Sequence, residues 1–116
     1  MTEWQIITTD AFDSWFGDLD ETTQDAVLDR LNVLRLRGPS LGRPTVDTVY
    51  GPRHSNMKEL RVGYKSIRAF FAFDPKRTAI VLCAGSKRGK GQKRWYKQMI
   101  AQADDLFDQH LQESKW

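Results

Sequence analysis

The strongest constraint on the fold lies in the second half of the chain, where three β-rich segments follow one another closely. Residues 57–62, 66–73 and 78–84 are rich in β-branched and aromatic residues, which favour strands. Only Asp74-Pro75-Lys76-Arg77, a sequence typical of a turn, separates the last two. Such short connections join antiparallel neighbours, because a parallel pair requires a long crossover. The sequence therefore predicts an antiparallel meander.

Helical patterns lie on both sides of these strands. Residues 2–8 resemble a short opening strand, after which Thr9 or Asp10 can cap a first helix and Asp20 a second. Gly38-Pro39 is expected to end the second helix. Residues 38–56, with three Gly and three Pro, predict a surface connection containing a short strand or turn near 46–49. An apolar stripe predicts a last, amphipathic helix over 92–111.

This order of elements predicts an α+β fold in one domain spanning residues 1–116. We expect a twisted antiparallel sheet with an N-terminal helical hairpin and a C-terminal helix. The simplest burial scheme packs the helices on one face of the sheet. The other face then stays partly open and can carry function.

Strand parity places two arginines together. If Leu60 and Val62 face the helices with the odd-numbered apolar residues of 66–73, then Arg61 and Arg68 share the opposite face. Two adjacent guanidinium groups repel each other, so an anion is expected beside them. Glu59, on the same face, or a bound phosphate can supply it; a plain surface network of Glu59 with the arginines is the alternative.

Charge is distributed unevenly along the chain. Residues 1–29 hold eight acids and no Lys or Arg, whereas residues 30–97 hold 17 Lys and Arg against three acids. This pattern favours a polyanion-binding face, unless acids and bases interleave in the fold. The sequence from 85 to 97 carries six basic residues interspersed with glycines, and it includes Trp95 and Tyr96 near the start of the predicted last helix. It lacks the spacing of a nucleotide-binding P-loop.

Several classes of protein are disfavoured by the sequence. No apolar run approaches the roughly 20 residues of a membrane helix, and no secretory signal is evident, so a cytoplasmic location without membrane association is expected. Cys83 is alone and cannot form an intramolecular disulfide. His54 and His110 do not have the spacing of a zinc site.

Five short stretches, taken in order, resemble the phage-related HigB branch of the RelE/ParE toxin superfamily. They are Leu41-Gly42-Arg43-Pro44, Met57-Lys58-Glu59-Leu60-Arg61, Arg68-Ala69-Phe70-Phe71-Ala72-Phe73-Asp74, Gly85-Ser86-Lys87 and Arg94-Trp95-Tyr96. The resemblance implies a RelE-like domain that acts as the toxin of a type II toxin–antitoxin system. It also implies ribosome-dependent cleavage of mRNA without a metal or other cofactor, by attack of the RNA 2′-hydroxyl, leaving a 2′,3′-cyclic phosphate. A cognate antitoxin, expected to be of the helix-turn-helix type, would neutralise it.

The resemblance also implies roles for individual residues. Arg68 would clamp the phosphate, Arg88 or Lys87 would lie beside the leaving group, and Tyr96 would orient the nucleotide. Glu59 is either the general base or a counter-ion, because the two lysines that RelE carries on this strand are not matched cleanly by Lys58 and Glu59. The catalytic candidates are thus Arg68, Arg88, Tyr96 and Glu59, and the RNA-binding candidates are Arg61, Lys58, Lys87, Lys90, Lys93 and Arg94.

Two other functions fit the same resemblance. A ParE-like toxin would share the fold and inhibit DNA gyrase without cleaving any bond, since fold alone does not determine function. An inactive relative would only bind nucleic acid or its antitoxin. The clustered arginines and Tyr96 favour the nuclease.

Overall fold

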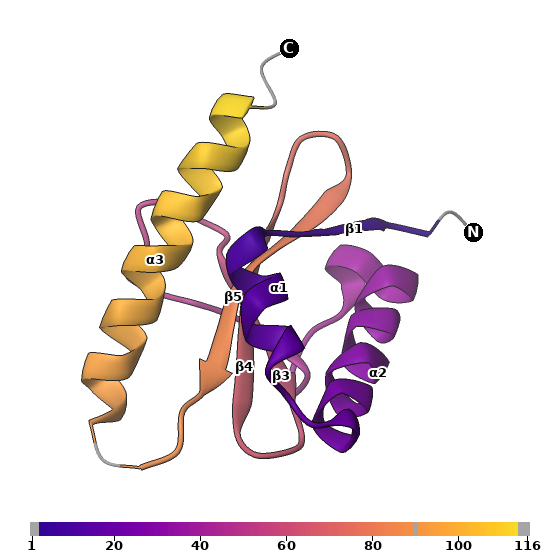
Figure 1. The fold of residues 1–116 in the computed structure, drawn as a ribbon. Helices are drawn as coiled ribbons and strands as arrows, with labels where there is room; N and C mark the ends of the chain where they lie inside the picture. The colour runs from indigo at the N-terminus through magenta and orange to yellow at the C-terminus, as the bar shows by residue number, and fades with distance from the viewer. Residues whose placement is uncertain (1–2, 90, 114–116) are drawn as a thin grey trace.

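A computed structural model describes residues 3–89 and 91–113 and shows a five-stranded sheet with three α-helices (Figure 1). The strand order is β1-β5-β4-β3-β2. The elements, in chain order, are β1 (Gln5–Thr8), α1 (Asp10–Gly17), α2 (Glu21–Arg37), a 3-10 turn (Gly38–Ser40), β2 (Val46–Thr48), β3 (Lys58–Val62), β4 (Ile67–Phe73), β5 (Thr78–Ser86) and α3 (Gln92–Glu113).

The α+β class and the antiparallel meander are confirmed, but the sheet is mixed. Strands β2, β3, β4 and β5 pair antiparallel with their neighbours, whereas β1 pairs parallel with β5. The expected antiparallel sheet therefore comprises β2 to β5, and β1 adds a parallel strand at its edge. Its partner strand β5 lies some 70 residues later in the sequence, so no local sequence pattern could have predicted that the two strands pair. The Thr9 hydroxyl fixes the junction with α1, because it accepts from the Phe12 amide and donates to the Leu82 carbonyl.

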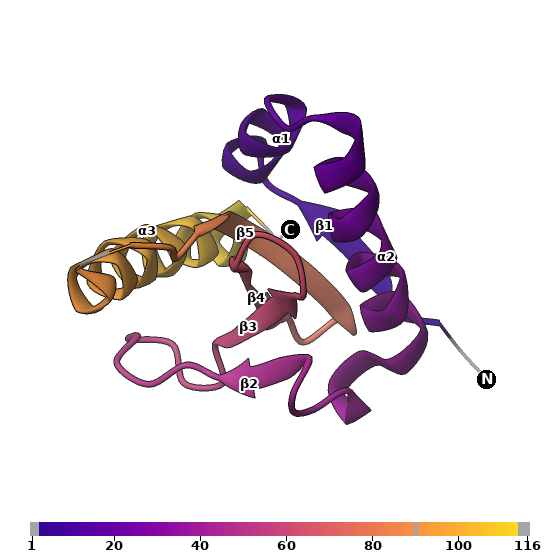
Figure 2. The ribbon, with the colours of Figure 1, turned by 90° about the horizontal axis from the view of Figure 1, so that it is seen from below.

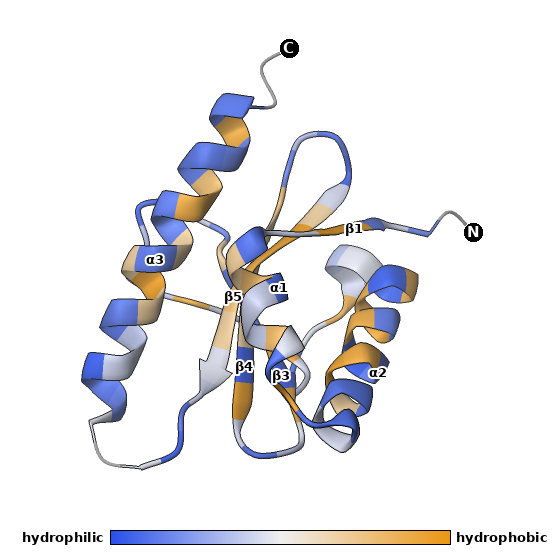
Figure 3. Cartoon of the chain, viewed as in Figure 1, coloured by the Kyte–Doolittle hydropathy of each residue, from blue (hydrophilic) through white to orange (hydrophobic). Residues whose placement is uncertain are grey.

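Helices cover both faces of the sheet, which corrects the expectation that they pack on one face (Figure 2). Helices α1 and α2 bury Phe12 and Leu34 against Leu60 and Phe71 on one side. Helix α3 buries its apolar stripe against the other side, including Phe70, Ile80 and Leu82. The physical signal is the composition of β4 and β5, since strands buried on both faces are apolar at nearly every position. Hydrophobic colour runs along much of β5 (Figure 3).

A β-bulge adapts β5 to these two layers. Phe70 pairs with Cys83 and Phe71 with Val81, so that Leu82 is the extra residue in the ladder. As a result, Leu82 and Cys83 both belong to the cluster under α3, whereas Val81 and Ala84 belong to the cluster under α1 and α2.

The acidic ends of the chain interleave in part with basic residues from its middle. Arg53 pairs with Asp105 and Asp108 of α3, and the backbone amides of Arg53 and His54 donate to the buried carboxylate of Asp104. At the other end, Glu3 pairs with Arg35. Within the described residues, no helix is both long and apolar enough to cross a membrane.

Both helices of the N-terminal pair begin and end as their sequence signals indicate. Thr9 caps α1 and Asp20 caps α2, with the Asp20 carboxylate accepting from the Thr23 amide at 2.8 Å. Gly38 follows α2 with φ +56°, in the region that favours glycine. A Cβ at Gly38 would lie 2.2 Å from Nε1 of the Trp4 indole. The position therefore requires glycine for its conformation and for its space.

We expect Gly38→Ala to lower the free energy of unfolding by about 2 kcal/mol or more, because it adds backbone strain to a clash with a large side chain. Gly17→Ala is the matched control. Its Cβ would meet nothing within 4 Å, and alanine favours the helix it ends. Urea unfolding of both variants provides the measurement. Equal stabilities of the two variants would contradict the packing described for Trp4.

Candidate functional site

The candidate site forms around the buried side chain of Glu59, on the face of the sheet that α3 covers. Register places Asp47, Glu59 and Phe70 side by side on β2, β3 and β4, and places Arg61 opposite Arg68. Glu59 is only 5% exposed. The prediction from parity that Arg61, Arg68 and Glu59 share one face is confirmed.

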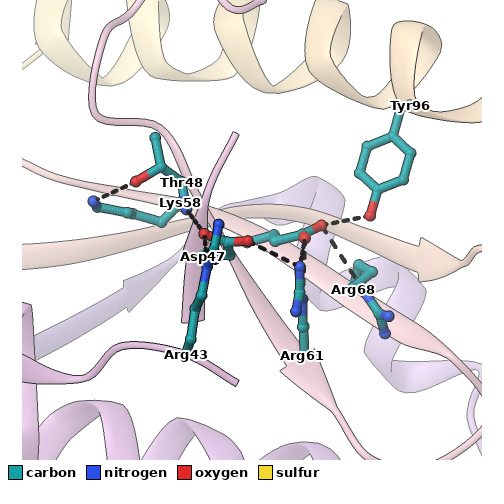
Figure 4. Close-up of polar contacts among 8 residues, drawn as sticks. Arg43, Asp47, Thr48, Lys58, Arg61, Arg68 and Tyr96 are labelled. Atoms are coloured by element: carbon teal, nitrogen blue, oxygen red, sulfur yellow. Dashed lines mark hydrogen bonds and ion pairs between the residues drawn. The ribbon is translucent and has the colours of Figure 1, made fainter. Parts of the chain in front are cut away.

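The Glu59 carboxylate contacts three cationic or polar side chains from three elements (Figure 4). Arg61 donates to Oε2 from Nε at 3.2 Å and from Nη2 at 3.0 Å. The Tyr96 hydroxyl of α3 donates to Oε1 at 2.6 Å. Arg68 approaches the same oxygen with Nε at 3.9 Å. One buried negative charge thus holds two guanidinium groups together that would otherwise repel each other.

Arg68 retains hydrogen-bonding capacity within this cluster. Its Nη1 donates to the carbonyl of Ile67 at 3.2 Å, but its Nε is buried and has no hydrogen-bond partner among the described residues. The 3.9 Å approach to Glu59 is an ion pair and is too long for a hydrogen bond. The side chain is 15% exposed, so solvent supplies little compensation. Because the Nε is enclosed, an incoming anion would have to bind the terminal nitrogens of the guanidinium group.

The ionic network extends to the sheet edge through two residues that sequence reasoning did not assign. Arg61 also contacts Asp47 at 3.1 Å, and Asp47 accepts from Nε of Arg43 at 3.0 Å. Arg43 lowers the pKa of the Asp47 carboxyl group, and Arg61 adds to the effect. Asp47 pairs with Glu59 in the register of β2 and β3, so the two side chains lie on the same face of the sheet. Alternation of side chains along the predicted short strand near 46–49 was the sequence signal that could have placed Asp47 beside Glu59.

Aromatic packing positions Tyr96. Its ring packs edge-on against the rings of Phe70 and Trp95, with centroid distances of 6.0 Å and 5.0 Å. Trp95 in turn lies against Gly85, where a Cβ would approach its ring to 3.3 Å. Burial, followed by the contact with Glu59, raises the pKa of Tyr96 to about 12. The phenol therefore stays uncharged and able to donate at neutral pH.

The two candidates for a second cation lie in different places. The Lys87 ammonium lies 5.7 Å from the centroid of the Tyr96 ring, within cation–π range and beside the cluster. Arg88, the next residue, instead lines a pocket with Trp15, Asp20 and Ile67, on the face that α1 and α2 cover. Of these two candidates, only Lys87 lies beside the cluster, so the choice of Arg88 as a catalytic candidate was wrong. Successive residues of an extended chain point to opposite faces, and β5 ends only at Ser86.

The remaining candidates lie at the margins of the cluster. Lys58 has the opposite parity, as expected, and donates to the Thr48 hydroxyl at 3.0 Å. Lys93 and Arg94 are exposed in the first turn of α3. Lys90 lies outside the described residues. Within the described part of the chain, no three His, Cys, Asp or Glu side chains are grouped so that they could hold a metal ion.

Taken together, the cluster has the chemical groups that cleavage of a phosphodiester requires. Two guanidinium groups can bind phosphate oxygens in fork geometry. A carboxylate within hydrogen-bonding distance of a phenol can accept a proton, and an ammonium group beside them can supply one.

Comparison with known proteins places the chain in a family. Residues 14–108 match the family model described as phage derived protein Gp49-like (DUF891). "Putative toxin HigB2" of Mycobacterium tuberculosis is 48% identical over 101 residues, which is 84% of this chain and 50% of that protein. "Putative toxin HigB3" of the same organism is 43% identical over 106 residues, 91% of this chain and 92% of that protein. The chain thus spans about half of the first relative and nearly all of the second.

Solved structures with the same fold include RelE toxins. RelE in the archaeal RelE–RelB complex from Pyrococcus horikoshii superposes with a TM-score of 0.60 at 14% identity, covering 78% of this chain and 100% of that one. The isolated E. coli RelE toxin superposes with a TM-score of 0.60 at 11% identity. The match covers 83% of this chain and 98% of the RelE chain. At these identities the likeness concerns the fold, and the family follows from the sequence matches. The chain therefore belongs to the Gp49-like family, shares substantial sequence identity with two proteins named as putative HigB toxins, and has the fold of RelE toxins.

Proposed function

We propose that this protein is a toxin that cleaves mRNA, with the cluster around Glu59 as its active site. The observation that carries the proposal is a buried carboxylate in contact with two arginines and a tyrosine, with the Nε of Arg68 lacking a hydrogen-bond partner among the described residues. A purely structural ion pair has no need of such unused donors, since buried polar groups are normally paired. Family membership supports the proposal, because two relatives bear the name of toxins.

In the proposed reaction, the RNA supplies its own nucleophile. Arg68 and Arg61 bind the non-bridging oxygens of the phosphate and offset the charge that grows as the 2′-oxygen attacks phosphorus. Glu59 accepts the 2′-hydroxyl proton. The bond from phosphorus to the 5′-oxygen breaks, and the Lys87 ammonium donates a proton to that oxygen. The products are a 2′,3′-cyclic phosphate and a 5′-hydroxyl end, and exchange with water resets Glu59 and Lys87.

Tyr96 acts in this scheme as an uncharged hydrogen-bond donor. Its pKa of about 12 keeps the phenol protonated at neutral pH. Its ring, fixed by Phe70 and Trp95, offers a surface on which a nucleobase can stack.

The proposal includes two partners. We infer that the mRNA is cut on the ribosome, which would present the RNA in the bent form that in-line attack requires. We also infer a cognate antitoxin, since the solved structures with this fold include RelE–RelB and RelBE complexes. A small helix-turn-helix protein encoded beside this chain would be the expected antitoxin.

Arg68→Ala should reduce mRNA cleavage by about 100- to 1,000-fold, because it removes a preorganised donor at the phosphate. The assay is a translating extract with chelator present, in which 5′ ends of the mRNA are mapped. Arg37→Ala, at an exposed position of α2, is the matched control and should cut normally. Thermal unfolding should show both variants folded. Wild-type cutting by Arg68→Ala would refute the site, and inhibition of gyrase with intact mRNA would replace the proposed function.

The Tyr96 phenol should ionise with a pKa of about 12. Tyr50 and Tyr64 are exposed and lie outside the Glu59 cluster. Glu59→Gln should lower the Tyr96 pKa, because the carboxylate charge and its hydrogen bond both raise it. The raised pKa stabilises the fold at pH below 10, and that contribution is lost as pH rises through 12. Absorbance at 295 nm, as the difference from Tyr96→Phe, reports the phenolate. Ionisation of Tyr96 near pH 10 in the wild type would contradict its burial against Glu59.

A further inference from the structure

A pocket lies at the same end of the sheet as the Glu59 cluster but on the other face of the sheet. Its volume is about 390 Å³, within the size range of sites for small ligands. Trp15, Leu19 and Ile67 give it apolar walls. Its polar residues carry both signs of charge and include Asp18, Asp20, Lys65 and Arg88. Nothing in the reaction proposed above uses this pocket.

The most buried polar group of the pocket is unsatisfied. Thr23 lines it and is only 2% exposed, and its hydroxyl has no hydrogen-bond partner among the described residues. The side chain and the amide of Thr23 both lower the pKa of the Asp20 carboxyl group, but only the amide, at 2.8 Å, forms a hydrogen bond of standard geometry. A buried hydroxyl without a partner is costly, so a ligand that bonds to it gains affinity.

The chain directly connects this pocket to the Glu59 cluster. Gly85 pairs with Arg68 and Ser86 pairs with Ile67 in the β4–β5 ladder. Lys87 then contacts Tyr96 on one face, and Arg88 lines the pocket on the other. Two consecutive cations therefore mark a path around the end of the sheet from one site to the other. A strand of RNA with its phosphate at Arg68 would follow these cations with its backbone.

The walls of the pocket match the chemistry of a nucleobase. Single-stranded bases are recognised by stacking on aromatic side chains and by hydrogen bonds at their edges. Trp15 offers the aromatic surface, and Thr23 with Asp18 offers polar atoms at the edge. Carboxylates accept hydrogen bonds and, when ionised, do not donate them, so they select bases that carry an exocyclic amino group, such as cytosine.

We propose that this pocket binds a base of the mRNA near the cleaved linkage and favours bases with an exocyclic amino group over uracil. The inference rests on the proposed ribonuclease function and extends it to base preference. A side chain from a partner protein is the competing occupant. The path along Lys87 and Arg88 favours RNA, because it leads from the pocket to the groups that would hold the scissile phosphate.

The test compares the affinities of deoxycytidine and deoxyuridine hexamers, which lack the 2′-hydroxyl and cannot be cut. The wild-type protein should bind the cytidine hexamer about three- to tenfold more tightly. Thr23→Val removes the hydroxyl at nearly constant shape and should reduce this preference without lowering the melting temperature. Thr22→Val, an exposed position in the same turn, is the matched control and should retain it. Asp18→Asn should also weaken the preference.

Each outcome decides the proposal. Equal affinity for the two hexamers in the wild type, or equal behaviour of Thr23→Val and Thr22→Val, would overturn it. If the protein still cuts mRNA in either case, the ribonuclease function stands and only the base pocket is lost. If the protein neither binds the hexamers nor cuts mRNA, both proposals fail. If an antitoxin, but no RNA, shifts the NMR signal of the Trp15 indole, the pocket binds protein and the inference is wrong.

Discussion

The Glu59 carboxylate is the interaction on which the rest of the site depends. An ionised carboxylate is costly to bury unless cations and hydrogen-bond donors surround it, and here they come from β3, β4 and α3. Its removal would leave Arg61 and Arg68 directly opposite each other on adjacent strands. The same charge aligns the Tyr96 hydroxyl, so a single residue sets the spacing of the groups we assign to RNA cleavage.

The two-sided burial of the sheet explains why function is placed at its end. Helices α1 and α2 pack on one face of the sheet, and α3 packs on the other face over β4 and β5 (Figure 2). At the end of the sheet where β4 begins and β5 ends, charged side chains lie on both faces. Lys87 and Arg88 follow directly after β5 and extend positive charge to each side. An RNA strand can therefore contact both the cluster and the pocket without entering the core.

Local signals predicted much of this arrangement, whereas features that depend on distant pairing were not predictable. Parity alone placed Glu59, Arg61 and Arg68 on one face, because alternation in a strand is a strict geometric rule. The parallel pairing of β1, the role of Asp47 and the position of Arg88 depend on which strands become neighbours and where β5 ends. The apolar runs of β4 and β5 did indicate burial on both faces. That signal outweighs the assumption that all helices pack on one side.

Attack by the RNA's own 2′-hydroxyl on a phosphate held at this cluster can be tested by removing that hydroxyl at a single position. An mRNA with a single deoxyribonucleotide immediately 5′ of a mapped cut is translated in the presence of the protein, beside the all-ribose parent. We expect no cleavage at the deoxy linkage, and we expect the parent to yield a 2′,3′-cyclic phosphate and a 5′-hydroxyl end. Undiminished cleavage at the deoxy linkage, or a 5′-phosphate product, would show that water is the nucleophile and would contradict the account.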